Sequence, residues 1–165
     1  MRILGVDPST HTGVACTDLE DLAIGRLIEF PNERGWSRVQ LIARSFDQAM
    51  DWYRPEYVVF EDYALGMGRS ATTIITQVEV GTMLRNVVYN KGISWLEVKP
   101  STLKKWTTGK GNAKKEAMMA AAVERWQFQS DSDDIVDAFA LSMYGHELVK
   151  QLDNLPQGVR KNGSW

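Results

Sequence analysis

Four acidic side chains of this sequence have surroundings that point to chemistry rather than to a solvated surface. They are Asp7, Glu61, Asp134 and Asp137. Asp7 and Glu61 each follow a short apolar run, so each is expected at the end of a buried strand. Asp134 and Asp137 are three residues apart in a segment with helical spacing, so they share one helix face. Asp7 alone also suits a turn, and Glu61 alone an exposed strand end, but the set of four is hard to explain by structure.

Asp137 is the acid that structure explains least well. It lies within the apolar segment 135–141, where a carboxylate is unfavourable unless a metal ion or a partner compensates it. Acids at the start of the same helix have a simpler explanation, because they cap free amides and favour the helix dipole. We assign that role to Asp131 and Asp133.

The chemistry of the four acids favours magnesium. Mg²⁺ prefers carboxylate oxygens and keeps several waters, and the sequence has only two histidines and one cysteine, too few for a zinc cluster. Two such ions about 4 Å apart suit phosphodiester hydrolysis, because one activates a water and the other stabilises the leaving oxygen. The acids therefore predict a Mg²⁺-dependent nuclease, with Mn²⁺ as an alternative ion.

A basic stretch precedes the acidic helix. Its six lysines, with no acid among them, are Lys99, Lys104, Lys105, Lys110, Lys114 and Lys115. The net charge of the chain is only −2, so the nature of the partner is inferred from this local pattern rather than from the total. A protein that holds both a phosphate backbone and a divalent cation needs basic and acidic groups close together. A solvated helix-and-loop face is the simpler alternative for the lysines.

Apolar periodicity predicts the elements that position these residues. Strands are expected over residues 2–7, 14–17, 22–30, 57–61 and 93–98, and helices over 36–53, 71–88, 113–126 and 133–148, with a lysine-rich turn or helix after residue 100. This order predicts an α/β fold with a mixed five-stranded sheet and helices on both faces. The first and fourth strands can be neighbours in such a sheet, which would bring Asp7 and Glu61 to one edge.

The composition fits one globular domain. The chain has 165 residues, of which 44% are hydrophobic, and Cys16, its single cysteine, is expected in the core. No apolar run approaches the roughly 20 residues of a membrane span, and the N-terminus has no signal-peptide pattern. We therefore expect a cytoplasmic protein without a membrane partner. The domain is expected to cover residues 1–150, and residues 151–165 to form a loosely ordered tail.

Three segments resemble the RuvC-type Holliday junction resolvases. They are GVDPSTHTG at residues 5–13, VVFE at 58–61 and DIVDAFA at 134–140, and the similarity runs in order over residues 1–148. The resemblance implies a ribonuclease H-like fold, a homodimer and Mg²⁺-dependent cutting of four-way DNA junctions in a bacterial or phage-infected cell. The chain is shorter and more acidic than many relatives, which fits a phage-encoded branch.

The resemblance also implies roles for single residues. The metal-binding acids of the family correspond to the four acids above. Its two functional lysines correspond to Lys104 and Lys115, and Lys115 is then expected to neutralise charge near the scissile phosphate. Contacts to the DNA backbone are expected from Lys104, Lys105, Lys110 and Lys114. One position departs from the family: many relatives carry an aromatic wedge where this sequence has Ala64, and the neighbouring Tyr63 is the candidate substitute.

The sequence thus predicts an endonuclease that resolves four-way DNA junctions by paired nicking, with other branched junctions as a wider substrate class. Paired cuts need two sites related by a two-fold axis, and the helix over residues 71–88 is the candidate for dimerisation. A ribonuclease H-like enzyme acting on RNA or an RNA–DNA hybrid stays open, because phosphate contacts do not identify the sugar. An actin-like ATPase shares the opening turn but usually has over twice this length. A junction-binding protein with a dead site would not need all four acids.

Overall fold

The structure, a computed structural model, describes residues 1–18, 21–63 and 70–153. Within them a five-stranded sheet has the strand order β3-β2-β1-β4-β5. The strands are β1 (Arg2–Asp7), β2 (His11–Asp18), β3 (Asp21–Glu29), β4 (Tyr57–Glu61) and β5 (Ser94–Val98). β1 and β2 pair antiparallel, as do β2 and β3, whereas β1–β4 and β4–β5 are parallel pairs. The mixed five-stranded sheet expected from the sequence is confirmed.

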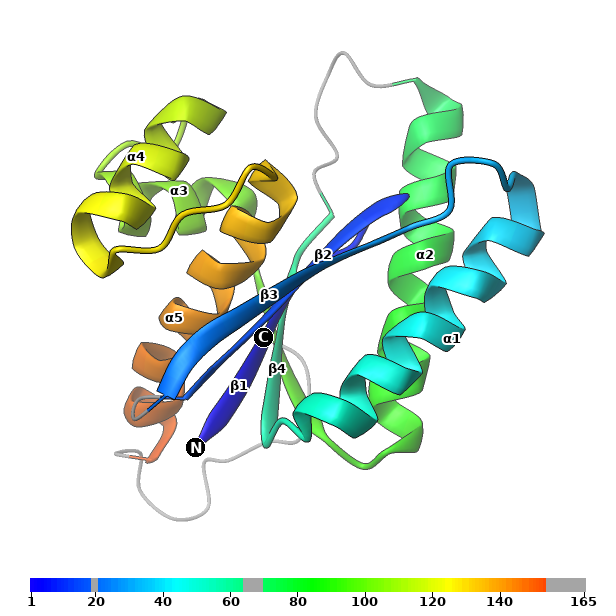
Figure 1. Ribbon diagram of the computed structural model, residues 1–165, viewed down its shortest axis with the longest axis horizontal. Helices are drawn as coiled ribbons and strands as arrows, with labels where there is room; N and C mark the ends of the chain where they lie inside the picture. Colours follow the sequence, from blue (N-terminus) through cyan, green and yellow to red (C-terminus); the bar gives the residue numbers. More distant parts are fainter. Residues whose placement is uncertain (19–20, 64–69, 154–165) are drawn as a thin grey trace.

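Helices cover both faces of this sheet, as Figure 1 shows. The helices are α1 (Gly35–Tyr53), α2 (Ala71–Asn90), α3 (Pro100–Thr108), α4 (Lys115–Trp126) and α5 (Asp133–Asp153). α1 and α2 pack together on one face, and α5 crosses the other face with α3 and α4 outside it. This arrangement confirms the expected α/β layers. None of the helices in the described ranges is long and apolar enough to cross a membrane.

Alternate side chains of the central strands supply two separate cores. Leu4 and Val6 of β1 pack with the apolar faces of α1 and α2. Ile3 of β1 and Val59 of β4 pack instead with α3, α4 and α5. Since side chains alternate between the faces of a strand, the odd-numbered positions of β1 and β4 face α5. Cys16 is buried in the first of these cores, as expected.

The direction of the strands gathers their connections at one edge of the sheet. β3 is antiparallel to β2, which is antiparallel to β1, so β3 runs in the same direction as β1, β4 and β5. The C-terminal ends of these four strands therefore lie at one edge. β1 and β4 are neighbours with Val6 opposite Phe60, so the next residues, Asp7 and Glu61, lie side by side at this edge. The expected adjacency of the first and fourth strands is confirmed.

The element boundaries differ from expectation by two to five residues in β2, α2, α4 and α5, and α2 ends at Asn90 rather than at residue 88. β2 begins at His11 rather than at residue 14, because Gly13 already pairs with Asp7 in the β1–β2 register. α4 begins at Lys115 rather than at residue 113. α5 continues to Asp153, and residues 154–165, predicted to be a loosely ordered tail, lie outside the described part of the chain.

Candidate active site

Asp7 and Glu61 point to the face of the sheet that carries α5. Both occupy odd-numbered positions at the C-terminal ends of adjacent parallel strands, in line with Ile3 and Val59. Asp7 is buried, with 9% of its surface exposed, and Glu61 is half-buried. A buried carboxylate at a strand end is unfavourable unless other groups compensate its charge. The neighbours that surround Asp7 therefore decide what this site can do.

The first two turns of α5 supply the other two acids. Asp134 and Asp137 are half-buried, and they lie one turn apart because α5 is a regular α-helix from Asp133. The residues between and beside them, Val136 and Ala138, are buried against the sheet. The structure thus brings together all four acids that the sequence singled out, from β1, β4 and α5.

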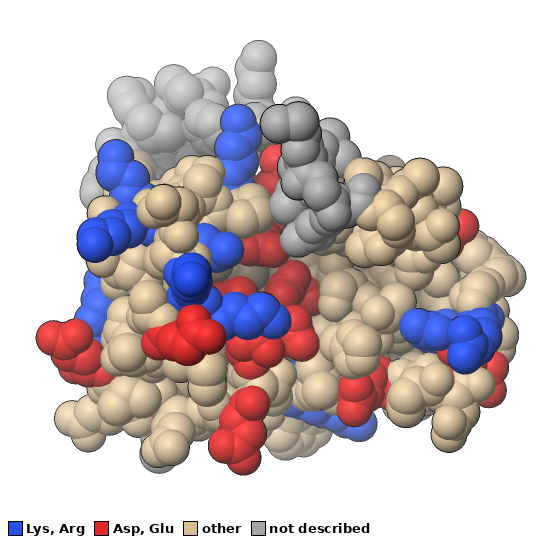
Figure 2. All heavy atoms as spheres, turned by 90° about the horizontal axis from the view of Figure 1, so that it is seen from above, with Lys and Arg blue, Asp and Glu red and all other residues tan. Residues whose placement is uncertain are grey.

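These acids line one open cleft of about 670 Å³ at the C-terminal edge of the sheet. Figure 2 looks onto this edge and shows acidic side chains in the hollow, with basic side chains on both sides of them. The charged residues that line the cleft are Asp7, Arg34, Arg38, Glu61, Lys104, Lys115, Asp133, Asp134 and Asp137. Five acids and four bases leave the cleft with a small excess of negative charge, and the acids form its centre.

Burial, with the charge of neighbouring acids, raises the pKa values of Asp7, Asp134 and Asp137. The pKa of Asp7 is well above its usual value, first because of burial and then because Glu61 and the two acids of α5 lie near it. Burial also raises the pKa of Asp137 to about 6, against the opposing effect of Lys104. The pKa of Asp134 is raised by burial and by Asp133. A cation bound among them would lower these pKa values again, because it favours the charged forms.

The carboxylates of this cleft are close enough to influence one another. Glu61, Asp134 and Asp137 all contribute to the raised pKa of Asp7. In the described part of the chain, no three Asp, Glu, His or Cys side chains are arranged to hold a single ion as they stand. The donors nevertheless fit a hard divalent cation, because they are carboxylates alone, from three elements, around one cleft.

Comparison with known proteins identifies the family of this chain. The sequence profile of the family described as Crossover junction endodeoxyribonuclease RuvC matches residues 3–145. The chain belongs to the RuvC family. Among its relatives, the RuvC of Heliobacterium modesticaldum is 28% identical over 151 residues, which cover 87% of this chain and 92% of that protein. The RuvC of Synechococcus is 26% identical over 159 residues, which cover 88% and 98%.

Solved structures of RuvC share the fold of this chain. Thermus thermophilus RuvC superposes with a TM-score of 0.74 at 20% identity, over 92% of this chain and 96% of that one. The same protein in complex with a Holliday junction substrate gives a TM-score of 0.78 at 19% identity, with the same coverage. The ribonuclease H-like fold implied by the sequence is thereby confirmed. A phage origin for this RuvC-family chain stays a prediction.

The structure separates the lysines of the basic stretch into two groups. Lys104 and Lys115 line the cleft, whereas Lys105, Lys110 and Lys114 are exposed and lie outside its lining. The ammonium group of Lys115 forms a short ion pair with Asp133, and this hydrogen bond raises the pKa of Lys115. Of the predicted DNA-binding lysines, only Lys104 and Lys115 are thus placed beside the acids of this RuvC-family site.

The helix-capping role assigned from the sequence to Asp131 and Asp133 needs correction. The side chain that accepts a hydrogen bond from a free amide at the start of α5 is Ser132, which accepts from the amide of Ile135 over 3.4 Å. Asp133 is in the first turn of α5, but its carboxylate pairs with Lys115 and lines the cleft. Asp131 is exposed and does not line the cleft. The sequence could not show this difference, because the partner of Asp133 comes from another helix.

Tyr63, the candidate substitute for the wedge, and Trp106, which lies within the lysine-rich segment, have different settings. Tyr63 follows β4, two residues after Glu61, and its hydroxyl accepts a hydrogen bond from Arg85 of α2 over 3.2 Å. Residue 64, where many relatives carry the wedge, lies outside the described residues. Trp106 stacks on Trp126 at 5.4 Å between ring centroids and donates from Nε1 to Glu147 over 2.8 Å. Trp106 therefore joins α3 to α4 and α5 by packing.

Sequence reasoning missed the wall of the cleft that α1 and α2 form. Arg34 and Arg38 line it from the start of α1, and Thr72, Thr73 and Thr76 line it from the start of α2. No motif marks these residues. In sequence order α1 follows β3 and α2 follows β4, and both strands end at the same edge as Asp7. This signal can be used only when the strand order and directions are already known.

Proposed function

We propose that this RuvC-family chain is a Mg²⁺-dependent endonuclease that resolves four-way DNA junctions by paired nicking. The observation that carries the proposal is the gathering of four carboxylates, from β1, β4 and α5, in one cleft with lysines beside it. Relatives are named crossover junction endodeoxyribonucleases, and a structural neighbour has been solved with a Holliday junction substrate. Other branched DNA is a further substrate class that fits the same cleft.

The four acids would hold the metal. Two divalent ions bound there would supply an activated water and stabilisation of the leaving oxygen. The carboxylates must be deprotonated to bind them, which makes metal binding depend on pH. Asp7 and Glu61 approach from the sheet and the two acids of α5 from above it, so the cations would lie between strand ends and helix. Mn²⁺ would substitute because it accepts the same oxygen ligands.

Lysines would hold the DNA beside the metal. Lys104 and Lys115 line the cleft from α3 and α4, so they can reach phosphates next to the scissile one. Lys105, Lys110 and Lys114 would contact the backbone farther out, and Tyr63 would act near the junction centre. Positive charge on this side attracts the phosphate backbone without identifying the sequence.

A homodimer would supply the second site that paired nicking requires. α2 is the proposed interface, because it exposes Ile75 and Val78 on one face, three residues apart. A two-fold axis through such a contact uses the same patch on both copies and places the two clefts symmetrically. The molar mass in solution, compared between the parent and an Ile75→Asp/Val78→Asp variant, tests this interface.

The decisive assay mixes the protein with a synthetic four-way junction, with Mg²⁺ or with EDTA. We expect symmetric nicks in two strands only with the metal, and losses of at least about 100-fold for Asp7→Asn, Glu61→Gln, Asp134→Asn and Asp137→Asn, since even outer-shell partners are worth about 10- to 100-fold. Asp131→Asn is the matched control, because Asp131 is exposed and outside the cleft. Undiminished cutting by Asp7→Asn would overturn the metal assignment, and preferential cutting of an RNA–DNA hybrid would change the substrate.

A further inference from the structure

The cleft has a second basic wall, on the side away from the lysines. Arg34 and Arg38 line it at the start of α1, whereas Lys104 and Lys115 line the opposite side from α3 and α4. Figure 2 shows basic side chains on both sides of the acidic centre. α1 and α3 lie on opposite faces of the sheet, so the two pairs of bases flank the acids rather than forming one patch.

Strand direction explains why arginines from the β3–α1 connection reach this cleft. β3 runs in the same direction as β1 and ends at Glu29, opposite His11 at the start of β2. The chain therefore leaves β3 at the edge where Asp7 ends β1, and it turns into α1 at Gly35. β5 ends at the same edge, and α3, which follows it, supplies Lys104. The two basic walls thus include the starts of the helices that follow the outer strands β3 and β5, and Lys115 at the start of α4 completes the second wall.

Arg38 is held in place but keeps free hydrogen-bond donors. Its Nε donates to the carbonyl oxygen of Glu33 over 2.6 Å, and the Glu33 carboxylate accepts from Ser37 over 2.8 Å. Within the described ranges, neither Arg34 nor Arg38 forms an ion pair with an acid, whereas Lys115 is paired with Asp133. Among the described residues, only Nε of Arg38 has a hydrogen-bond partner, so its two outer nitrogens can bind a phosphate, which an arginine fork holds with two hydrogen bonds.

The same wall carries short hydroxyl side chains. Thr72, Thr73 and Thr76 at the start of α2 line the cleft together with the two arginines. Hydroxyls and arginines are the groups that most often contact phosphate and sugar oxygens in DNA complexes. A wall of this composition, extended along the edge of two helices, suits a polymer of phosphates better than a single small anion.

We propose that Arg34 and Arg38 bind DNA phosphates on the α1 side of the cleft, opposite the lysines of α3 and α4. This inference rests on the proposed function. It adds a binding position for the part of the DNA strand that lies on the α1 side of the scissile phosphate. A strand whose scissile phosphate lies over the acids continues in both directions, so its flanking phosphates need basic partners on both walls. The acidic centre repels those phosphates, and the arginines offset that repulsion on one side.

Binding measurements in the inactive Asp7→Asn background test the proposal, because cleavage then does not interfere. Arg38→Gln and Arg34→Gln are compared with Arg44→Gln, which removes an exposed arginine of the same helix that lies outside the cleft lining. Affinity for a four-way junction with Mg²⁺ is measured at several salt concentrations. We expect each cleft variant to weaken binding and to reduce the slope of log K against log salt by about 0.9, and Arg44→Gln to leave both unchanged. Arg38→Lys should recover part of the affinity, since it keeps the charge but loses the fork.

A neutral-phosphate scan locates the contact. Methylphosphonate linkages, which remove one phosphate charge at a time, are placed along the cleaved strand. We expect one linkage that weakens binding by the parent but has no further effect on Arg38→Gln. Parent-like affinity and salt slope for both cleft variants, or equal effects of every linkage on the parent and on Arg38→Gln, would overturn the proposal.

Failure of this inference differs from failure of the proposed function. If the parent protein cuts the junction with Mg²⁺ and the arginine variants bind like Arg44→Gln, then Arg34 and Arg38 do not bind phosphates. The proposed nuclease function would still hold. If the parent neither binds nor cuts any branched DNA, both are wrong. Far-UV circular dichroism and the melting temperature of each variant show whether a weaker binder is still folded.

Discussion

Gly13 of β2 lies directly against the backbone of Asp134: a Cβ atom at position 13 would be 2.0 Å from the Asp134 carbonyl oxygen. Gly5 of β1 meets α5 in the same way, with a Cβ position 1.9 Å from the carbonyl oxygen of Ala138. No side chain fits at either position without moving the helix. The two glycines therefore allow α5 to lie close to β1 and β2, and this places Asp134 and Asp137 near Asp7.

Gly13→Ala is expected to displace the start of α5 and to weaken metal binding. The added methyl group meets backbone atoms, which cannot rotate away, so the helix must shift. Overpacking of this kind typically destabilises by about 1–3 kcal/mol. We expect a melting temperature several degrees lower, and Mg²⁺ affinity and junction cleavage reduced by about tenfold or more, measured by calorimetric titration and by a cleavage time course.

Gly92→Ala is the matched control for that variant. Gly92 follows α2 with φ of 67°, so alanine there is strained, but a Cβ would meet nothing within 4 Å. This substitution should lower stability by about 1–2 kcal/mol without changing Mg²⁺ affinity. Equal metal affinities for the two glycine variants would show that the close packing of α5 does not position the acids.

The apo protein is expected to lose stability as the pH rises through the range in which Asp137 ionises. Its pKa is about 6 in the folded state and near 3.8 in an unfolded chain. Between these values the unfolded state has released a proton that the folded state keeps, so raising the pH favours unfolding. The pKa of Asp7 is raised as well, which extends the effect in the same direction. These two groups should therefore make the melting temperature in EDTA lower at pH 8 than at pH 5.

Mg²⁺ should reverse this dependence. The cation competes with protons for the same carboxylates, so its stabilising effect should be small at pH 5 and larger at pH 8. Asp137→Asn should show a smaller Mg²⁺-induced rise of the melting temperature at pH 8, together with a weaker pH dependence in EDTA. A Mg²⁺ effect that is independent of pH, or unchanged in that variant, would contradict a role for Asp137 in metal binding.

The candidate site was largely predictable from the sequence because its acids occupy positions that patterns reveal. Asp7 and Glu61 end apolar runs, and a strand that ends in a buried carboxylate has few structural explanations. Helical spacing placed the acids at 134 and 137 on one face. Their gathering followed from one topological expectation, the adjacency of the first and fourth strands, which the sheet order bears out.

Other parts of the site depend on contacts between segments far apart in the sequence. The pairing of Asp133 with Lys115 joins α5 to α4, and it could not be read from the charge of either segment. Arg38 reaches the cleft only because β3 runs parallel to β1 at the far side of the sheet. Local patterns fix helices and strands, whereas such neighbours follow from strand order and from the packing of helices on the sheet.

Lys115→Met is expected to lower cleavage without lowering stability. The side chain of Lys115 is 72% exposed, so its ion pair with Asp133 contributes little to folding. Its place at the cleft suits a phosphate instead. We expect an unchanged melting temperature and cleavage slower by about 10-fold or more, whereas Lys114→Met, at an exposed neighbour outside the cleft lining, should cut nearly as fast as the parent. Equal cleavage rates for the two variants would show that Lys115 has no role in cleavage.

Arg85 is expected to position the end of β4. Its guanidinium donates to the carbonyl oxygen of Gly81 over 3.0 Å and to the Tyr63 hydroxyl, and it lies 4.7 Å from the centre of the Tyr63 ring. Its Nε also pairs with Glu97 of β5 over 2.6 Å. Arg85 thus joins α2, β5 and the segment that follows Glu61.

Arg85→Met should therefore destabilise the fold and disturb the neighbouring acid. Loss of several charge-assisted hydrogen bonds from a side chain that is 13% exposed is expected to lower the free energy of unfolding by about 1.5–3 kcal/mol. We also expect weaker Mg²⁺ binding through displacement of Glu61, with partial recovery in Arg85→Lys. Loss of stability with unchanged metal affinity would limit Arg85 to a purely structural role.

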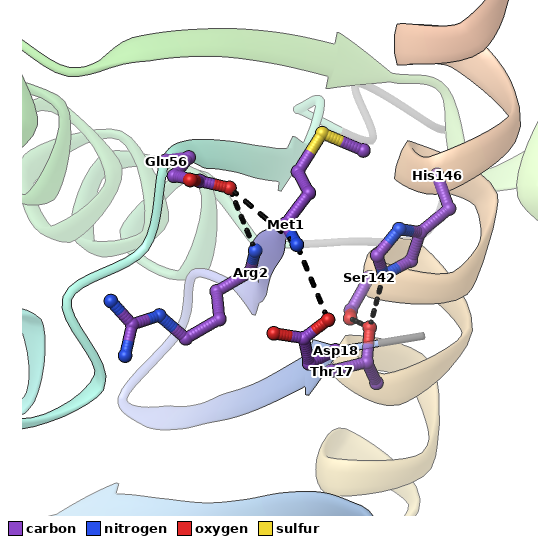
Figure 3. A network of polar contacts seen from close by, with 7 residues as sticks. All are labelled: Met1, Arg2, Thr17, Asp18, Glu56, Ser142 and His146. Atoms are coloured by element: carbon purple, nitrogen blue, oxygen red, sulfur yellow. Dashed lines mark hydrogen bonds and ion pairs between the residues drawn. The ribbon is translucent and has the colours of Figure 1, made fainter. Parts of the chain in front are cut away.

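A polar network lies near the start of β1, beside Met1 and Arg2, as Figure 3 shows. Asp7 ends the same strand, so the network and the acids lie at opposite ends of β1. His146 of α5 is 3% exposed, and its Nε2 lies 2.8 Å from the hydroxyl oxygen of Thr17, which also contacts Ser142. The Nδ1 atom of His146 has no hydrogen-bond partner among the described residues. Burial lowers the pKa of His146, while Asp18 near it acts in the opposite direction.

His146 is accordingly expected to make the fold sensitive to mild acid. Because its pKa is lower in the folded state than the usual 6.5, the unfolded chain takes up a proton first as the pH falls through that value, so acid favours unfolding. The acids of the cleft act in the opposite direction, so the effect is read from a difference: the melting temperature of the parent in EDTA, relative to that of His146→Gln, which cannot titrate, should decrease between pH 7.5 and pH 5.5. His11→Gln, at the exposed histidine of β2, should follow the parent curve. Junction cleavage at pH 8 should be unaffected by His146→Gln, since the network and the acids lie at opposite ends of the sheet. Parallel curves for the parent and His146→Gln would show that this imidazole contributes nothing to the acid sensitivity.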